Sequence, residues 1–253
     1  MLEQSFFNAL LVVWFTLGVV IFVLLFFVAV PYGRYFRGGW GPTIARRLGW
    51  VIMEAPAAIG FVVWFSQGNY STRMVSIVFL GLWEAHYIYR AFIYPLRLRG
   101  MEKRMPVLIV AMAFLFNVVN SYINGRYLFT LSSGYSSEWF VDIRFIVGIV
   151  FFIFGFVINR QSDEILLTLR KSGESEYRVP RGGLFRWVSC PNYFGETVAW
   201  IGWGIMTWSI PGVVFAVWTV ANLVPRARSH HMWYLKHFSD YPSERKALVP
   251  GVW

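Results

Sequence analysis

The stretch GWVIMEAPAAIGFVVWF, from Gly49 to Phe65, is apolar enough to enter a bilayer, yet it carries Glu54 near its start and Pro56 two residues later. A membrane-spanning helix needs about 20 mostly apolar residues. An acidic side chain in such a helix costs about 2.5–3.5 kcal/mol on insertion scales, so these residues are rare and commonly functional. We therefore expect Glu54 to face the interior of a helix bundle and to act there as a hydrogen-bond donor or a proton carrier.

The rest of the 253-residue chain has the composition of a membrane protein with several spans. Hydrophobic residues make up 57% of it and charged residues 14%, whereas soluble domains carry about 25% charged residues. The single cysteine, Cys190, cannot form an intrachain disulfide, and the first apolar run lacks the basic start of a cleavable signal peptide. The apolar runs predict an all-α protein, a single domain of seven transmembrane helices, with spans at 6–30, 50–65, 74–94, 107–123, 145–158, 193–208 and 211–224.

Basic residues gather in alternate connections between these spans. They cluster within 34–47, 97–104, 160–186 and 226–246, whereas the remaining connections hold only Arg73, Arg126 and Arg144. By the positive-inside rule, this distribution predicts an N-terminus outside and a C-terminus in the cytoplasm. The net charge of +10 is thus explained by topology and does not indicate a nucleic-acid partner.

Further polar residues occur inside two other predicted spans. In the span 74–94, one helical stripe holds His86, Arg90 and Tyr94, with Tyr87 beside it. In the span 107–123 and just after it, three asparagines recur at helical spacing: Asn117, Asn120 and Asn124. Polar groups in a membrane find partners inside the bundle, so we expect these faces to meet each other and Glu54. Taken singly, Arg90 and Tyr94 also suit the membrane interface.

The connection from 159 to 192 reads NRQSDEILLTLRKSGESEYRVPRGGLFRWVSCPN. Arginines suit phosphates, and the amide and acidic side chains suit ribose or carboxamide groups. This loop and the C-terminal tail 225–253 are therefore predicted to form a nucleotide-binding surface, although a positive-inside loop would explain the arginines alone. No G-x-G-x-x-G follows a strand, which argues against a Rossmann site. The tail histidines lack the cysteine or carboxylate that would complete a metal site, so no metal is expected.

In these residues the chain resembles the steroid 5α-reductase family, integral membrane enzymes that reduce the Δ4 double bond of 3-oxo-steroids with NADPH. The motifs, in chain order, are PYGRY, MEAP, HYIYRAFIYPL, DIRF, INRQSD, LRKSGESEYRVPRGGLF, NYFGE, WIGWG and RSHHMWYLKHFSDYPSERKALVP. The resemblance runs nearly from end to end. It implies a seven-helix bundle whose cofactor enters from the cytoplasmic side and whose lipophilic steroid substrate enters from the membrane.

The resemblance also implies roles for individual residues. Glu54 and Tyr87 match the pair that binds the steroid 3-ketone and polarises it for hydride addition at C5. Trp50 and Trp200 match positions that line the substrate cavity. Glu84 has no counterpart that we expect from the family, and our hypothesis is that it tunes Arg90 or His86. The implied cofactor-binding positions are Tyr32, His86, Arg90, Asn159, Asp163, Arg170, Tyr177, Arg178, Asn192, Glu196, Arg226, His230 and Tyr234.

Several alternatives use parts of the same pattern. A reductase of a trans-2-enoyl-CoA or of a polyprenol needs the same hydride chemistry with a different cavity. A methyltransferase of the isoprenylcysteine type, which uses S-adenosylmethionine, should carry two glutamates where this chain has His230 and His231. A proton-coupled transporter would explain Glu54 but not the polar cluster after 159. A retinal protein needs a lysine in its last span, and 211–224 contains none.

The abundance of arginines favours NADPH over NADH, because a 2′-phosphate binds such residues. We expect a monomer in the inner membrane if the source is bacterial, or in the endoplasmic reticulum if it is eukaryotic. In either case the cofactor site should face the cytoplasm.

Overall fold

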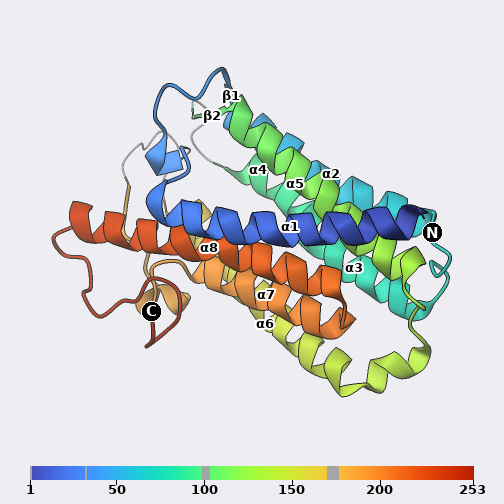
Figure 1. Cartoon of the computed structure of the whole chain (residues 1–253). Helices are drawn as coiled ribbons and strands as arrows, with labels where there is room; N and C mark the ends of the chain where they lie inside the picture. The colour runs from blue at the N-terminus through green and yellow to red at the C-terminus, as the bar shows by residue number, and fades with distance from the viewer. Residues whose placement is uncertain (1, 32, 99–102, 170–176) are drawn as a thin grey trace. The chain divides into compact units, whose positions relative to one another are not determined.

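The computed structural model describes residues 2–31, 33–98, 103–169 and 177–253. Nearly all the regular secondary structure of the described chain is helical (Figure 1). Its longer helices are α1 (Leu2–Phe27), α2 (Arg46–Ser66), α3 (Met74–Ile88), α5 (Val107–Arg126), α6 (Ile143–Thr168), α7 (Pro191–Thr207) and α8 (Ile210–His237). The shorter elements are α4 (Tyr94–Arg97), helical turns at Gly33–Tyr35, Tyr89–Ile93, Tyr127–Leu131, Ser137–Val141 and Gly183–Arg186, and strands β1 (Thr43–Ala45) and β2 (Arg104–Pro106).

The all-helical class predicted from the sequence is confirmed, and each predicted span falls largely within a helix. Among the described residues, five helices are long and apolar enough to cross a membrane: α1, α2, α5 with its extension to Leu131, α6 and α8. The small antiparallel pair of β1 and β2 was not predicted. Arg104 secures this pair by donating to the side chain and the main chain of Thr43, at 2.7 and 2.6 Å.

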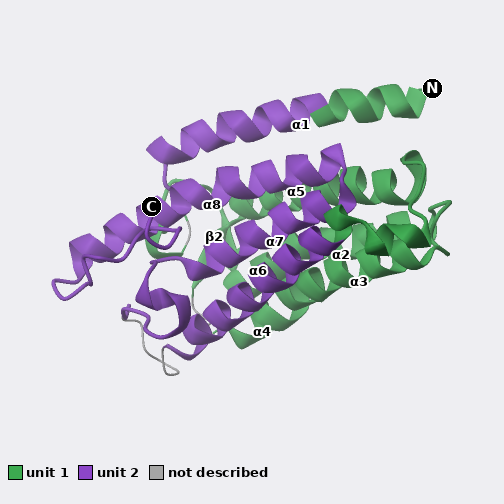
Figure 2. Ribbon diagram, turned by 90° about the horizontal axis from the view of Figure 1, so that it is seen from below, with its two compact units in different colours: residues 1–11, 30–145 green, residues 12–29, 146–253 purple. Residues whose placement is uncertain are grey.

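The chain divides into two compact units (Figure 2). Unit 1 comprises residues 1–11 and 30–145, and unit 2 comprises residues 12–29 and 146–253. Helix α1 contributes its first part to unit 1 and its remainder to unit 2.

Helices α2, α3 and α5 form the core of unit 1. On α2, Met53, Ala57 and Phe61 recur every four residues and are buried, which is the spacing of one helical face. Phe61 stacks on Trp83 of α3 with ring centroids 4.2 Å apart, and the Trp83 indole donates to the Ala57 carbonyl at 2.9 Å. A β-carbon at Gly60 would lie 2.5 Å from the Ser121 hydroxyl of α5. This packing fixes the rotation of α2 about its own axis. It therefore also fixes the direction in which Glu54, the residue after Met53, points.

Helices α6 and α7 of unit 2 approach each other through glycines. A β-carbon at Gly155 would lie 2.4 Å from the Gly195 carbonyl oxygen, and one at Gly195 would lie 2.5 Å from the Asn159 amide nitrogen. Small residues permit this close packing of membrane helices. Helix α8 starts where the Ser209 hydroxyl accepts a hydrogen bond from the Gly212 amide at 3.1 Å, a typical N-cap. The predicted cofactor residues at the start of α7 are therefore held directly against Asn159.

Candidate active site

Glu54 is held by residues from two neighbouring helices of unit 1. The Asn117 amide donates to the Met53 carbonyl at 2.6 Å and to Glu54 Oε2 at 3.3 Å. The Arg90 guanidinium lies 3.7 Å from Glu54 Oε1, and these two side chains are only 13% and 15% exposed. The expectation that these polar faces meet Glu54 is confirmed for Asn117 and Arg90. In this arrangement Glu54 accepts a hydrogen bond and pairs with a positive charge, so it is not the hydrogen-bond donor that its place in the span predicted. Because a buried charge is stable only when it is paired, the contacts fix both the position and the charge partner of Glu54.

Arg90 belongs to a π-helical turn, Tyr89–Ile93, that continues α3. Its guanidinium carbon lies 4.7 Å from the ring centroid of Trp50 and 5.3 Å from that of Tyr94, within the range of cation–π contacts. The sequence prediction assumed a regular α-helix here, and the wider turn departs from it. Such turns often occur at functional sites because they redirect side chains. Here the turn presents Arg90 to both Trp50 and Glu54.

Tyr87 is buried in unit 1, with 4% of its surface exposed. Its ring centroid lies 4.9 Å from that of Trp83 and 5.1 Å from that of His86. These neighbours restrict rotation of the phenol, so its hydroxyl has a defined direction. Glu84 precedes Tyr87 by one helical turn, while the ion pair of Arg90 is with Glu54. The tuning of Arg90 or His86 by Glu84 therefore stays a hypothesis.

A second polar cluster joins α6 to the start of α7 in unit 2. Asn159, which is 1% exposed, donates to the Asn192 carbonyl at 3.0 Å and to Glu196 Oε2 at 3.4 Å. The Arg160 guanidinium donates to Asn159 Oδ1 at 2.8 Å and lies 3.6 Å from Asp163 Oδ2. Four residues predicted from the sequence are thus brought together. Arg160 was not among the residues predicted for the site, although its position three residues before Asp163 on a helix is typical of an ion pair.

The remaining predicted cofactor residues of unit 2 lie on α8 or near it. His230 Nε2 lies 3.2 Å from the Tyr193 hydroxyl at the start of α7. The ring of Tyr177 lies 5.1 Å from that of Trp233. Tyr234 is buried, Arg226 is half-buried and Arg178 is exposed. Together with the Asn159 cluster, these side chains offer basic groups that suit phosphates, amide and acidic groups that suit hydroxyls or a carboxamide, and aromatic rings.

Other predicted residues fall elsewhere. Tyr32 and Arg170 lie outside the described residues. Trp200 is 1% exposed and packs in the aromatic core of unit 2, where its ring centroid lies 4.3 Å from that of Phe215 and 5.9 Å from that of Phe152. Within the described ranges, no group of three or more histidine, cysteine or acidic side chains could hold a metal ion.

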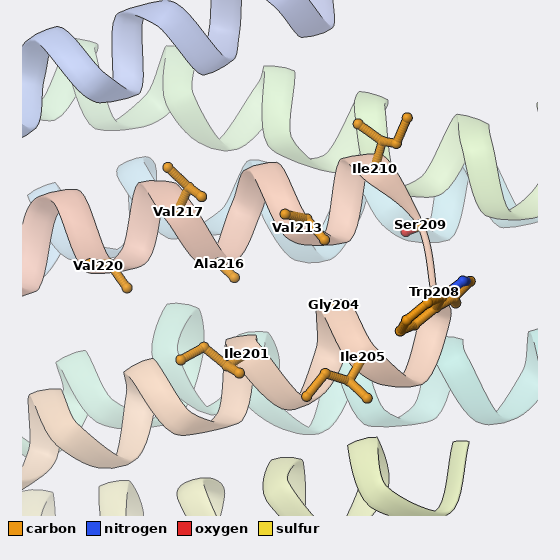
Figure 3. A pocket seen from close by; sticks show the side chains of 10 residues that line it. All are labelled: Ile201, Gly204, Ile205, Trp208, Ser209, Ile210, Val213, Ala216, Val217 and Val220. Atoms are coloured by element: carbon orange, nitrogen blue, oxygen red, sulfur yellow. The ribbon is translucent and has the colours of Figure 1, made fainter. Parts of the chain in front are cut away.

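An apolar groove of about 580 Å³ lies between α7 and α8 (Figure 3). Its one hydroxyl-bearing lining residue, Ser209, already contacts the Thr207 hydroxyl at 2.9 Å and the Gly212 amide at 3.1 Å. A binding site for a polar reacting group needs a few placed polar side chains, so this groove is not the candidate active site. It is lined by Ile201, Gly204, Ile205, Trp208, Ser209, Ile210, Val213, Ala216, Val217 and Val220.

Comparisons with known proteins identify the family of this chain. Residues 103–253 match the family described as 3-oxo-5-alpha-steroid 4-dehydrogenase. The chain is 38% identical to the steroid 5-alpha-reductase DET2 of Gossypium hirsutum, with 99% of each chain covered. It is 40% identical to DET2 of Arabidopsis thaliana, over 99% of this chain and 98% of the relative.

An animal relative is equally similar. The chain is 38% identical to 3-oxo-5-alpha-steroid 4-dehydrogenase 1 of Bos taurus, over 98% of this chain and 97% of the relative. Matches of this extent confirm the resemblance seen in the motifs. The chain therefore belongs to the steroid 5α-reductase (3-oxo-5-alpha-steroid 4-dehydrogenase) family of oxidoreductases.

Proposed function

We propose that this protein reduces the Δ4 double bond of 3-oxo-Δ4-steroids to 5α-dihydrosteroids with NADPH, and that Glu54 and Tyr87 polarise the 3-ketone. The observation that carries the proposal is the burial of Glu54 between Arg90 and Asn117 inside an apolar unit. That unit also buries Tyr87. Relatives named for this reaction align with the chain almost from end to end.

The chemistry requires stabilisation of negative charge on the ketone oxygen. In our proposal the Tyr87 phenol donates a hydrogen bond to that oxygen, and Glu54 supports the same contact. Arg90 keeps positive charge beside the pair, 3.7 Å from Glu54. A fixed donor of this kind, aimed at a developing oxyanion, is worth about 10²–10³ in kcat. The fully buried ring of Trp83 packs against Tyr87, and a water-poor surrounding of this kind strengthens electrostatic interactions.

The cofactor would be held by the polar residues of unit 2. Arg178 and Arg226 suit its phosphates, Asp163 and Glu196 suit ribose hydroxyls or the carboxamide, and Tyr234 offers an aromatic face. When bound, NADPH supplies the hydride for the reduction. His86 and Arg90 stay proposed members of the same shell, and Trp50 and Trp200 stay proposed parts of the substrate cavity.

We propose a single membrane domain of seven spans with the N-terminus outside and the cofactor site facing the cytoplasm. The five apolar helices of sufficient length support this topology, as do the helical α3 and α7 at the other two predicted spans. A monomer would take its steroid directly from the bilayer, in the inner membrane of a bacterium or the endoplasmic reticulum of a eukaryote.

The proposal is tested by following NADPH oxidation with the purified full-length protein in detergent. Progesterone, a trans-2-enoyl-CoA and a polyprenol serve as parallel substrates. We expect turnover with progesterone and little with the other two. Turnover with only the enoyl-CoA or only the polyprenol would keep the reductase chemistry but contradict the steroid assignment. Failure to bind NADPH, together with binding of S-adenosylmethionine, would favour the methyltransferase alternative.

A further inference from the structure

A hydrogen-bonded cluster centred on Ser189 lies beside the proposed cofactor residues of unit 2. The Ser189 hydroxyl, in a residue that is 3% exposed, lies 2.7 Å from His231 Nδ1 and 2.6 Å from the Tyr241 hydroxyl. The Ser189 amide donates to the Lys246 carbonyl at 2.9 Å. We call Ser189, His231 and Tyr241 the polar clasp. It joins three separate segments, namely the connection before α7, the end of α8 and the C-terminal segment 238–253.

The clasp anchors the C-terminal segment, which turns back beside the short helix that precedes α7 (Figure 1). Val188 and Lys246 form a parallel β-bridge. Arg245 is buried, donates to the Pro180 carbonyl at 3.1 Å and lies over the Tyr241 ring. Leu248 packs with Cys190 and Ala227 in a small apolar core. The segment is therefore an integral part of unit 2.

Two members of the clasp adjoin residues in the proposed cofactor site. The Tyr241 ring stacks on Tyr234, with centroids 5.1 Å apart and planes 5° apart. His231 follows His230, whose ring contacts the Tyr193 hydroxyl at 3.2 Å. Ser189 also lies three residues before Asn192. The clasp thus links the start of α7 and the end of α8. These two places hold Asn192, Glu196, His230 and Tyr234 of the proposed cofactor site.

One assignment of protons satisfies the cluster. Burial raises the pKa of the Tyr241 phenol, so this group keeps its proton and can donate to Ser189 Oγ. Ser189 in turn donates to His231 Nδ1, which is an acceptor when the neutral imidazole carries its proton on Nε2. The Lys246 carbonyl oxygen, 3.2 Å from Ser189 Oγ, is a second acceptor for the same hydrogen. Ser189→Ala would leave the Tyr241 hydroxyl and His231 Nδ1 without this partner, and loss of Tyr241 or His231 would remove one of the bonds of the buried Ser189 hydroxyl.

We propose that Ser189, His231 and Tyr241 are positioning residues that set the affinity of the protein for NADPH. The clasp holds Tyr234 and His230 in place before the dinucleotide arrives, so less ordering is needed on binding. None of the three has to touch the cofactor. This inference rests on the proposed function, because it concerns the same cofactor site.

The test measures NADPH affinity, kcat and KM with progesterone for the full-length protein in detergent. Tyr241→Phe keeps the ring on Tyr234 but removes the hydroxyl, and Ser189→Ala removes the centre of the clasp. We expect each to raise the Kd and the KM for NADPH about 5- to 10-fold, the effect of losing one net hydrogen bond or slightly more. The kcat at saturating NADPH should stay within about twofold, because transition-state contacts are unchanged.

Two further variants test the proposed bonding of His231. Asn places an amide group near the position of Nδ1, so His231→Asn should retain affinity within about threefold, whereas His231→Leu should weaken it like Ser189→Ala. Tyr70→Phe in unit 1 is the matched control, because Tyr70 packs on Arg73 and should not affect NADPH binding. Thermal melts without NADPH report any loss of folding separately.

The outcomes separate the two proposals. If the wild type binds NADPH and the clasp variants bind it equally well, even with lowered melting temperatures, the cluster is purely structural and the inference is overturned. If the wild type itself does not bind NADPH, the proposed function fails and the inference fails with it. Weaker binding in Ser189→Ala, Tyr241→Phe and His231→Leu, with recovery in His231→Asn, supports the clasp.

Discussion

Tyr87→Phe is expected to lower kcat for steroid reduction by about 100-fold or more, since it removes a donor aimed at the developing oxyanion. The substitution keeps the ring that packs against Trp83 and His86, so the fold and the NADPH affinity should not change. The measurement is kcat and KM with progesterone, alongside the Kd for NADPH.

Tyr122→Phe is the matched control for this prediction. Tyr122 lies on α5 in the same unit and packs against Phe7 and Trp64. It is not part of the proposed site around Glu54. It should retain the activity of the wild type. A Tyr87→Phe enzyme that works as fast as the wild type would remove Tyr87 from the proposed mechanism.

Glu54→Gln is expected to abolish most activity and also to destabilise the protein. The introduced amide could still accept a hydrogen bond from Asn117, but the guanidinium of Arg90 would lose the negative charge 3.7 Å away. Breaking a buried ion pair by removing one partner typically costs about 3–5 kcal/mol. We expect a lower melting temperature and a fall in kcat of about 100-fold or more.

A double variant separates the two effects of Glu54. Glu54→Gln combined with Arg90→Met removes both charges, so the melting temperature should recover toward that of the wild type. The kcat at saturating NADPH should stay low, because Glu54 is still missing from the ketone site, while the Kd for NADPH reports separately any effect of losing Arg90. Recovery of both activity and stability would show that Glu54 only compensates Arg90, and it would contradict the catalytic role proposed for the carboxyl group.

Much of this architecture could be predicted from the sequence, because apolar length and polar periodicity are local properties. All seven predicted spans correspond to helices. The meeting of Glu54 with Asn117 and Arg90 followed from the rule that intramembrane polar groups face one another. Helix α8 extends to His237, whereas the predicted span ended at Val224. Hydropathy detects only the apolar part of a helix, and most residues from Arg226 to His237 are polar or aromatic.

Other features depend on contacts between distant residues. The π-turn at Tyr89–Ile93 inserts a residue into a helix, which a pattern of side chains does not reveal. The clasp joins Ser189 to partners 42 and 52 residues away. No local sequence pattern indicates that these residues contact one another. The sequence motifs identified the family, but only the packing of the C-terminal segment connects Tyr241 with Tyr234.

The most direct test of the central claim is the identity of the product made from progesterone and NADPH by the purified protein. Chromatography with mass spectrometry, against authentic 5α- and 5β-dihydroprogesterone, distinguishes the possible products. Our account predicts the 5α isomer, formed in proportion to the NADPH consumed and greatly reduced in Tyr87→Phe and Glu54→Gln. Unchanged progesterone, the 5β isomer, or a product reduced at the ketone would contradict it.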